Sequence, residues 1–470
     1  MPLQRGSGYT RKAPARAAIG LAARQIKNLR ALSERALEAN IVIAITLHNQ
    51  GKQLLAALES ATSQSLFISG EACIVILDDQ STDDWQALCG SSLDHPGIVV
   101  LNGYCGSAAR ARNGLLDYVD AHLPNAEWVA RLDADDTFAT DYSLEGMAGA
   151  GRKAGSQYVI GSNHLRIGPV TLPRTNIADK SVLLNREKLL RFIQAFCFGH
   201  QEQELPSCNL LIRTKSNIRY PDIHSAEDHW LVASLLVFRP HDGAVVSAPV
   251  YCSYSLSGQT TNHNRSNNEW TRQRVQLGQA VERWVLALNQ GAQLLGHGLE
   301  GIVTLDDRTV VKNFYPWRLD ESAANELAGL LAHAPASIAP SLEWSRAGNG
   351  DQRCSYQWSD LREISTQLQE DQVSIFLTDC FTAGLVVSNI SRSNLRLSAD
   401  GRLVNIDIGS DIVPFTVSRF LDSAARLYAI CVLGYSDQEL ARRNSVVPQH
   451  RCLREIPGFE RFYGDLVHSL

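Results

Sequence analysis

Four short apolar runs, each followed by a helix-like stretch, most constrain how the first half of this chain can fold. The runs are rich in Val and Ile and cover residues 41–47, 73–79, 98–102 and 128–133. After the first run, Leu54, Leu58 and Ala61 recur at the spacing of one helix face. Strands that alternate with helices in this way form a parallel sheet covered on both faces. We therefore predict an α/β domain with a mostly parallel sheet.

Polar side chains follow these runs at the points where the strands should end. His48 and Asn49 come after the first run, Asp78 and Asp79 close the second, and the string RLDADD, residues 131–136, closes the fourth. Ligands of open parallel sheets bind at the carboxyl ends of the strands. The shared location therefore favours a functional site.

Three carboxylates of the RLDADD string, Asp133, Asp135 and Asp136, stand within four positions. Like charges this close repel one another, and burial makes unpaired charges costly. A hard divalent cation such as Mg2+ or Mn2+ would relieve the repulsion, because these ions prefer carboxylate oxygens. The alternative is a solvated loop or a helix N-cap, where Asp is common.

The order of these motifs resembles that of the family 2 glycosyltransferases, which have a GT-A nucleotide-sugar fold with a Rossmann-like sheet. The shared elements are a His-Asn pair, a DDxSTD turn, an ARN helix, a DxD string and a Glu-Asp pair that opens a helix. In this sequence they are His48 with Asn49, 78–83, 111–113, 133–135, and Glu227 with Asp228. The resemblance covers about residues 40–265.

The resemblance implies a metal-dependent, inverting transfer of a sugar from a nucleotide-sugar donor, with uridine as the expected base. It implies that Asp135, together with Asp133, holds Mn2+ or Mg2+ beside the donor diphosphate. It gives Asp228, with Glu227 as the second choice, the role of the base that deprotonates the acceptor hydroxyl. The residues expected around the donor are Thr46, His48, Asn49, Asp78, Arg112 and Asp133. Arg112 would pair with phosphate or orient Asp133.

The last part of the chain carries a second set of motifs. Gly296, Gly298 and Gly301 form a GxGxxG string, and Lys312 follows on an expected strand. Asn394 and a D-x-G string that begins at Asp407 come later. These motifs resemble the glycine-rich loop, strand lysine, catalytic loop and metal loop of protein kinases. The resemblance implies a smaller α+β kinase-like domain with ATP as a ligand.

The same resemblance names Glu326 as the helix partner of Lys312 and places Asn389 at the position of the kinase base. An Asn side chain cannot take a proton from a hydroxyl group, so phosphoryl transfer does not follow from the motifs, although positioning and metals contribute much to that chemistry. Three hypotheses stay open for this part: a nucleotide-binding kinase that acts on the same glycan, a non-catalytic pseudokinase adaptor, and an acceptor-binding or scaffolding module.

Composition limits the class of protein and its partners. The chain has 470 residues, 44% of them hydrophobic, and a net charge of −5, which argues against a nucleic-acid partner. Its ten cysteines contain no CxxC pair, and free thiols suit the cytoplasm. We therefore expect a cytoplasmic glycosyltransferase whose acceptor is a glycan, a lipid-linked saccharide or a secondary metabolite.

The N-terminal segment differs from the rest in charge. Residues 1–38 contain eight Lys and Arg against two Glu, a balance of +6. Such a segment could touch the inner face of an anionic membrane or act as a targeting peptide. We favour a tail that leads into a solvated helix over residues 18–39. The expected domains are therefore 1–39, 40–265, a helical linker over 266–290, and 291–470.

Overall fold

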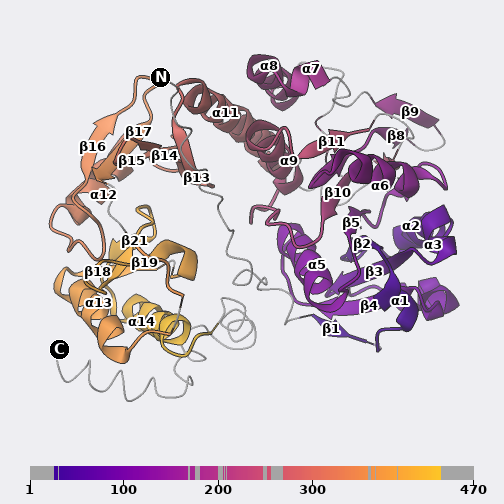
Figure 1. The fold of residues 1–470 in the computed structure, drawn as a ribbon, viewed down its shortest axis with the longest axis horizontal. Helices are drawn as coiled ribbons and strands as arrows, with labels where there is room; N and C mark the ends of the chain where they lie inside the picture. The colour runs from indigo at the N-terminus through magenta and orange to yellow at the C-terminus, as the bar shows by residue number, and fades with distance from the viewer. Residues whose placement is uncertain are drawn as a thin grey trace, which may run out of the picture.

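The computed structural model describes an α/β body, an α+β body and a long helix, α11 (Glu269–Asn289), that lies between them (Figure 1). The described residues are 26–29, 31–167, 170–174, 180–199, 205, 207, 209–246, 251–255, 268–357, 361–365, 367–388 and 390–435.

The first body is built on an eight-stranded sheet with the order β1-β4-β3-β2-β5-β10-β7-β11. Its strands are β1 (Lys27–Asn28), β2 (Ile41–Leu47), β3 (Ala72–Asp79), β4 (Ile98–Gly103), β5 (Trp128–Arg131), β7 (Tyr158–Ile160), β10 (Leu210–Arg213) and β11 (Gly243–Val245). Strands β4, β3, β2 and β5 are parallel, whereas β10 is antiparallel to both β5 and β7. The predicted α/β sheet is confirmed, with a parallel centre and mixed edges.

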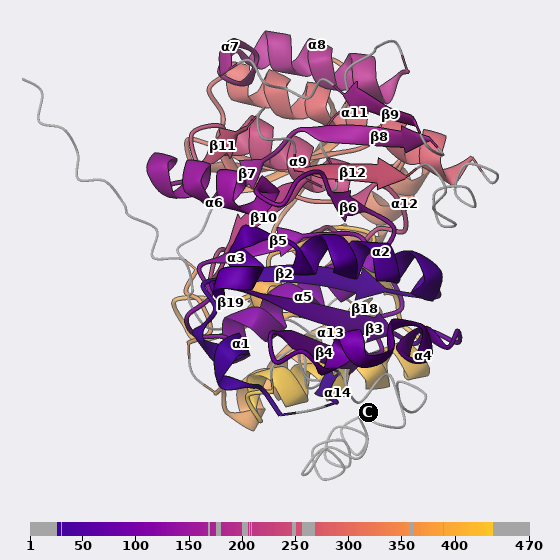
Figure 2. The same ribbon diagram turned by 90° about the vertical axis from the view of Figure 1, so that its right-hand side faces the viewer.

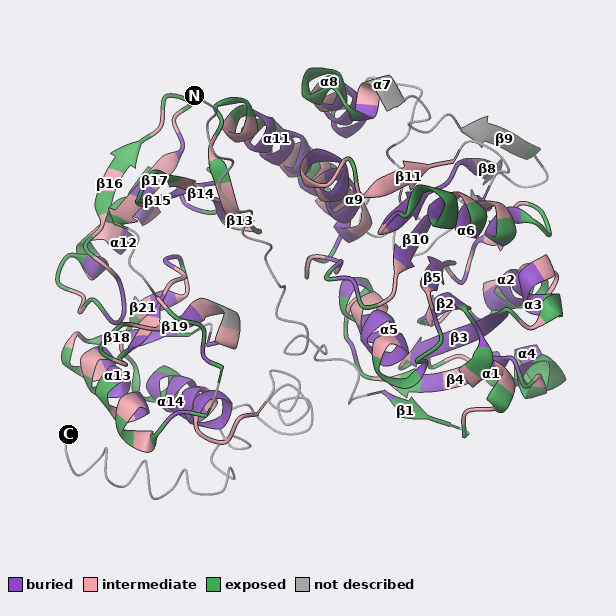
Figure 3. Ribbon diagram, in the orientation of Figure 1, coloured by how far each residue is buried: buried purple, intermediate pink, exposed green. Residues whose placement is uncertain are grey.

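Helices cover both faces of this sheet, because alternate residues of each strand point to opposite sides. Ile41, Ile43 and Ile45 pack in one apolar cluster with α2 (Gly51–Thr62), α3 (Ser65–Ser69), α4 (Trp85–Cys89) and α6 (Ser143–Ala154). Val42 and Ala44 pack in another, with α5 (Ala108–His122) and α9 (Glu227–Phe238). The central strands are therefore buried on both sides, as Figure 3 shows.

The N-terminal segment departs from the predicted helix over residues 18–39. Residues 1–25 lie outside the described part of the chain, and Lys27–Asn28 form an edge strand that pairs antiparallel with β4. Among the described residues of this segment, only Glu34–Glu38 (α1) are helical, with Ser33 as the N-cap. The prediction was wrong here because the apolar Ile26 packs into the core beside the sheet, which favours strand pairing over a solvated helix.

A second, four-stranded sheet follows the RLDADD string. Its strands β6 (Thr137–Phe138), β12 (Cys252–Ser255), β8 (Asn163–Ile167) and β9 (Val170–Arg174) lie in that order. Figure 2 shows these strands beside α2 and below α7 (Lys180–Leu183) and α8 (Arg186–Cys197). Helix α8 packs against α11, so this layer reaches the junction between the two bodies.

The second body begins with an antiparallel sheet in the order β13-β14-β15-β17-β16. Its strands are β13 (Gln293–His297), β14 (Gly301–Asp306), β15 (Thr309–Phe314), β16 (Glu343–Arg346) and β17 (Gln352–Gln357), and α12 (Glu321–Leu331) stands between β15 and β16 in the chain. A mainly helical part follows, with α13 (Glu370–Thr382), β18 (Leu385–Val387), β19 (Leu395–Leu397), β20 (Leu403–Asn405), β21 (Ile412–Pro414) and α14 (Val417–Cys431). The kinase-like fold stays a prediction for this α+β body.

The predicted helical linker is α11, and its aromatic face joins the two bodies. The indole Nε1 of Trp284 donates a hydrogen bond to the Tyr315 hydroxyl at 2.7 Å. The same indole packs against Trp230 and Phe238 of α9, with ring centroids 5.8 and 5.2 Å away. Ile302 and Tyr315 of the second body belong to the same buried cluster as these residues. The junction is therefore a continuous core and not a loose tether.

Within the described part of the chain, no helix has the length and apolar content needed to cross a lipid bilayer.

Replacing Trp284 with Ala should lower stability by about 3–5 kcal/mol, because it leaves a cavity and removes the partner of a buried hydroxyl. The measurement is the thermal unfolding midpoint. The matched control is Leu286→Ala on the same helix, where the side chain is 46% exposed and the expected change is within about 0.5 kcal/mol. Equal changes in the unfolding midpoint for the two substitutions would show that the Trp284 side chain does not stabilise a core shared by the two bodies.

Candidate functional site

The loops that follow β2 and β3 are bound to each other. The Asn49 backbone N–H donates to the Ser81 hydroxyl at 3.0 Å, and the Asn49 side-chain oxygen accepts from the Thr82 N–H at 2.7 Å. His48 Nδ1 lies 2.7 Å from the Asp79 carbonyl oxygen. The two loops thus form one wall at the carboxyl edge of the parallel strands, where the donor residues were expected.

The expected donor residue Asp78 is already engaged within this wall. Its Oδ1 accepts from the Ser81 N–H at 2.9 Å and its Oδ2 from the Trp85 indole at 3.1 Å. Asp79 accepts from the Cys105 N–H at 2.6 Å and so holds the loop after β4. Thr46 lies half-buried near the end of β2. Contact of Thr46 and Asp78 with a nucleoside stays a prediction.

Five charged side chains meet beside the RLDADD string, and we refer to them as the charge cluster. They come from α5, from the end of β5 and the turn after it, and from the first turn of α9: Arg112, Arg131, Asp133, Glu227 and Asp228. The site residues predicted around the DxD string and the Glu-Asp pair are therefore brought together. The formal charge of the charge cluster is −1, because it contains two guanidinium groups and three carboxylates.

Arg131 lies at the centre of the charge cluster. Its Nε donates to Asp133 Oδ1 at 2.8 Å and its Nη2 donates to Asp133 Oδ2 at 2.6 Å, so the ion pair is bidentate. Its Nη1 donates to Asp228 Oδ2 at 3.2 Å. Sequence reasoning missed this residue, although it is the first letter of the string. The signal was an Arg two positions before a carboxylate at a strand end, which places both side chains on one face.

Arg112 joins the remaining carboxylates. Its Nη1 forms an ion pair with Glu227, and its Nη2 lies 3.4 Å from Asp133 Oδ1. Both guanidinium groups, of Arg112 and Arg131, lie over the ring of Tyr220, 5.6 and 5.9 Å from its centroid. Arg112 therefore lies beside Asp133, as one of its two expected roles requires, and both roles stay predictions.

The three carboxylates of the charge cluster differ in the direction of their pKa shifts. Burial alone would raise the pKa of Asp228, but His229, Arg131 and Arg112 hold it below its ordinary value. Burial likewise opposes ionisation of Asp133, and Arg131 with Arg112 lowers its pKa. Burial keeps the pKa of Glu227 raised. Asp133 and Asp228 are therefore the carboxylates that stay ionised, and Asp228, on the first turn of α9, is the candidate base.

The backbone before α9 is strained. Ala226 has a φ of +62°, a left-handed conformation that costs a non-glycine residue roughly 1–2 kcal/mol. This residue directly precedes Glu227 and Asp228, so the strained turn sets where the first turn of α9 points.

Burial lowers the pKa of His229, which follows Asp228, to about 4, and this leaves the His229 ring neutral at pH 7.

Asp135 has the properties of a carboxylate that would gain from a cation. Burial, and then the negative charge of Asp133, raises its pKa to about 6. A divalent cation would reverse that penalty, because it favours the ionised form. Asp133 instead faces Arg131 and Arg112. The residues therefore fit a metal held through Asp135, with Asp133 fixed beside it, although within the described residues no three His, Cys, Asp or Glu side chains form a metal-binding group.

The second body brings together three of the residues predicted for its nucleotide site. Lys312 Nζ lies 3.0 Å from Asp407 Oδ1, and Asn394 Nδ2 donates to Asp407 Oδ2 at 3.2 Å. Burial alone would lower the pKa of Lys312, but Asp407 and Glu300 raise it, so the ammonium stays charged. Gly296 lies in β13, Gly298 in the hairpin loop, and Gly301 opens β14.

Two other expectations for the second body need correction or lie out of reach. Glu326 is not the partner of Lys312: it is exposed on α12, and Glu300 Oε2 lies 2.9 Å from Lys312 Nζ instead. The motif gave the wrong partner because the hairpin loop carries its own carboxylate between Gly298 and Gly301. Asn389 lies outside the described residues.

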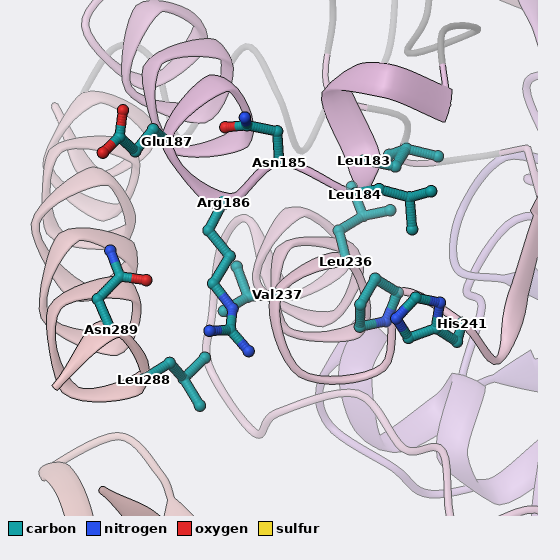
Figure 4. A pocket seen from close by; sticks show the side chains of 11 residues that line it. Leu183, Leu184, Asn185, Arg186, Glu187, Leu236, Val237, His241, Leu288 and Asn289 are labelled. Carbon is teal, nitrogen blue, oxygen red and sulfur yellow. The ribbon is translucent and has the colours of Figure 1, made fainter. Parts of the chain in front are cut away.

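A cavity of about 650 Å3 lies at the far end of α9 from Asp228 (Figure 4). It is lined by the loop before α8 and by the C-terminal ends of α9 and α11, with Arg186, Leu236 and His241 among its side chains. None of the predicted site residues lines it, so we place the site at the charge cluster.

Comparison with known proteins finds a family match within the first body. Residues 42–220 match the family model described as Glycosyl transferase family 2, and this match supports the predicted glycosyltransferase class. A stretch of 100 residues is 34% identical to the Escherichia coli protein "UDP-Glc:alpha-D-GlcNAc-diphosphoundecaprenol beta-1,3-glucosyltransferase WfaP". That stretch spans 21% of this chain and 37% of the relative.

Solved structures give weaker similarities. Residues 1–349 of S. aureus TarS in complex with UDP-GlcNAc are 19% identical, with 47% of this chain and 60% of that chain covered and a TM-score of 0.37. The mannosyltransferase PcManGT from Pyrobaculum calidifontis, in complex with GDP-Man and Mn2+, is 13% identical over 52% of this chain and 64% of its own, with a TM-score of 0.35. TM-scores of this size do not define a common fold.

Replacing Asp135 with Asn should stabilise the metal-free protein at pH 7.5 by about 1–3 kcal/mol. A folded-state pKa near 6, above the ordinary 3.8, makes ionised Asp135 a cost that is complete above pH 6 and fades as the pH falls towards 4. The gain should therefore shrink at pH 5. Thermal unfolding in EDTA at both pH values measures it, with Asp141→Asn at an exposed position as the control. A gain that does not depend on pH would contradict the raised pKa.

Proposed function

We propose that the first body transfers a sugar from a nucleotide-sugar to a hydroxyl group of an acceptor, with inversion at the anomeric carbon. The observation that carries the proposal is the charge cluster. It joins the DxD string, which lies within the family match over residues 42–220, to the Glu-Asp pair of α9, which lies just beyond that match. A donor-side carboxylate and a candidate base are thus fixed to the same guanidinium group.

The donor is a uridine-linked sugar in this proposal. The name of the E. coli relative specifies UDP-glucose as donor and a diphosphoundecaprenol-linked saccharide as acceptor. The joined loops after β2 and β3 would form the wall for the nucleoside, with Thr46, His48, Asn49 and Asp78 nearest to it. A glycan or lipid-linked saccharide is accordingly the acceptor class that we favour over a secondary metabolite.

Asp228 acts as the general base in the proposed reaction. Its depressed pKa keeps it ionised, so it can accept the proton of the acceptor hydroxyl as the oxygen attacks the anomeric carbon. Arg131 positions the Asp228 carboxylate through Nη1, and Oδ1 accepts from the backbone N–H of His229 at 2.7 Å and lies 3.3 Å from the ring Nδ1 of that residue. Glu227 is tied to Arg112 and serves the cluster's geometry in this mechanism.

A Mn2+ or Mg2+ ion bound at Asp135 would neutralise the charge of the departing diphosphate. The chain's own residues shape this binding position. Asp135 is largely buried, and two hydrogen bonds from Arg131 fix the orientation of the Asp133 carboxylate. Because Arg131 is itself pinned through Nη1 to the Ser207 carbonyl at 2.7 Å, the orientation of Asp133 does not depend on a ligand.

For the second body we propose a kinase-like nucleotide site. The observation in its favour is the meeting of Lys312, Asn394 and Asp407, which came from separate motifs. The base position holds Asn389, so we favour a regulatory nucleotide-binding or adaptor role over phosphorylation of the glycan. Consumption of ATP in the presence of a glycan acceptor would reverse that preference.

The cellular location belongs to the same proposal. We propose a cytoplasmic protein, with contact between its basic N-terminus and the inner face of the membrane as the alternative to a solvated tail. The eight buried cysteines of the described residues are all free, which agrees with a reducing compartment. A lipid-linked acceptor would place the substrate at the same surface.

A uridine-linked sugar should raise the thermal midpoint of the wild type only when Mn2+ is present, and Asp135→Asn should lose that rise. Mass action gives about 2.7 kcal/mol at a ligand concentration a hundred times the dissociation constant. The panel is UDP-glucose, UDP-GlcNAc, GDP-mannose and ATP, each with and without Mn2+. A shift by ATP alone would contradict the proposed donor site.

Replacing Asp228 with Asn should lower the rate of sugar transfer by about 10²–10⁴-fold and leave donor binding within about threefold. The assay follows release of the nucleoside diphosphate with a panel of saccharide acceptors, and calorimetry gives donor affinity. Asp222→Asn, the same change at an exposed residue near α9, is the control that should keep the wild-type rate. Retained transfer in Asp228→Asn would remove Asp228 from the role of base.

A further inference from the structure

The hairpin loop between β13 and β14 places a carboxylate where the motifs of the second body call for a ligand. Glu300 Oε2 lies 2.9 Å from Lys312 Nζ, and Lys312 is only 8% exposed. The other oxygen, Oε1, accepts hydrogen bonds from the Ser410 hydroxyl and from the Ser410 backbone N–H, the latter at 3.3 Å. An ammonium group, a hydroxyl and a backbone N–H thus converge on one anion.

Glycines make this approach possible. A Cβ on Gly409 would overlap the Glu300 carboxylate, so only a glycine lets the carboxylate reach Ser410. A Cβ on Gly301 would overlap the Asn313 carbonyl of the neighbouring strand. Gly296 and Gly298 have no such neighbour within 4 Å, so the space around the loop itself is open. Gly409 therefore leaves room for the Glu300 carboxylate, Gly301 lets β14 pair closely with β15, and a Cβ at Gly296 or Gly298 would meet open space.

The backbone of the loop is fixed on the side away from this anion. The Glu300 carbonyl accepts from the Tyr315 N–H at 2.8 Å, and the Leu299 carbonyl accepts from Arg318 Nε at 3.1 Å. The Gly298 N–H donates to the Gly301 carbonyl at 3.0 Å. The Glu300 side chain can consequently leave Lys312 by rotation about its own bonds, without unfolding the hairpin.

The electrostatics favour the seated carboxylate in the absence of a competitor. Burial alone would raise the pKa of Glu300, but Lys312 and Ser410 lower it, so the carboxylate stays ionised at neutral pH. The oxygen Asp407 Oδ1, 3.0 Å from Lys312, belongs to the same ion pair. One lysine therefore serves two carboxylates, and the excess charge of −1 would favour an accompanying cation whenever another anion arrived.

We propose that Glu300 is an internal occupant of an anion site, and that a phosphate chain carrying a divalent cation binds there only by displacing it. The ligand class is a nucleoside triphosphate or an inorganic polyphosphate, since both supply oxygens for Lys312 and Ser410 and a cation for Asp407 and Asn394. The inference rests on the kinase-like site proposed above and adds that this site is closed in the free protein.

The displaced state would be a minor one, which weakens the apparent affinity by the fraction of molecules that occupy it. If Glu300 is seated in about nine molecules of ten, binding is about tenfold weaker than the open site would allow. Replacing Glu300 with Gln keeps the size of the side chain and removes the charge that competes for Lys312. That substitution should therefore strengthen binding and not weaken it.

The test is isothermal titration calorimetry with ATP and with sodium tripolyphosphate, each with MgCl2. Glu300→Gln should bind at least one of them about tenfold more tightly than the wild type, and the double variant Glu300→Gln with Lys312→Met should lose that gain. The matched control is Glu326→Gln, an exposed glutamate of the same body that should behave as the wild type. Tighter binding of ATP than of tripolyphosphate would identify a nucleoside site; equal binding would identify a polyphosphate site.

Three outcomes would overturn the inference: equal affinity of the wild type and Glu300→Gln, the same gain in Glu326→Gln, or no binding to any variant. Each variant is first checked for folding by its Mn2+-dependent thermal shift with UDP-sugar. If that shift is absent in every protein, including the wild type, far-UV circular dichroism reports folding in its place. Failure of the sugar-donor proposal is thereby read separately from failure of the Glu300 inference.

Discussion

The contact that the rest of the first body depends on is the pair of hydrogen bonds from Arg131 to Asp133. A strand residue whose side chain is 8% exposed carries a full positive charge into the core, which is tolerable only because carboxylates surround it. Those carboxylates come from a turn after β5 and from the first turn of α9, two segments almost a hundred residues apart. The strands, the strained turn at Ala226 and the position of α9 all converge on satisfying that one guanidinium group.

Much of this arrangement could be predicted from the sequence, because it follows from local periodicity. The runs at 41–47, 73–79 and 98–102 became strands at those positions, and the polar residues after them line one edge of the sheet. What could not be predicted were partners set by tertiary packing. The pairing of Arg131 with both Asp133 and Asp228 depends on where α9 docks, and the choice of Glu300 over Glu326 depends on the depth to which a hairpin loop enters the second body.

The basic N-terminal segment also shows that tertiary packing can override a prediction from local sequence. Its alanine-rich composition favours a helix, and the helix prediction over 18–39 was wrong at Lys27–Asn28, which form a strand, whereas Glu34–Glu38 are helical. Ile26 sits against the sheet, and the strand at Lys27–Asn28 closes an edge that β4 would otherwise expose. The local preference for a helix was therefore outweighed by the burial of Ile26 and by the pairing of Lys27–Asn28 with the exposed edge of β4.

The shared aromatic core at α11 also sets an order of events during synthesis. Ile302 and Tyr315 belong to the cluster that contains Trp230, Trp284 and the helices covering the parallel sheet. A ribosome that has released only the first 290 residues has therefore exposed a domain whose core still lacks two of its side chains. This apolar cluster is complete only after the β13–β15 hairpins emerge, so its aromatic surface stays incompletely covered for some seconds at typical elongation rates.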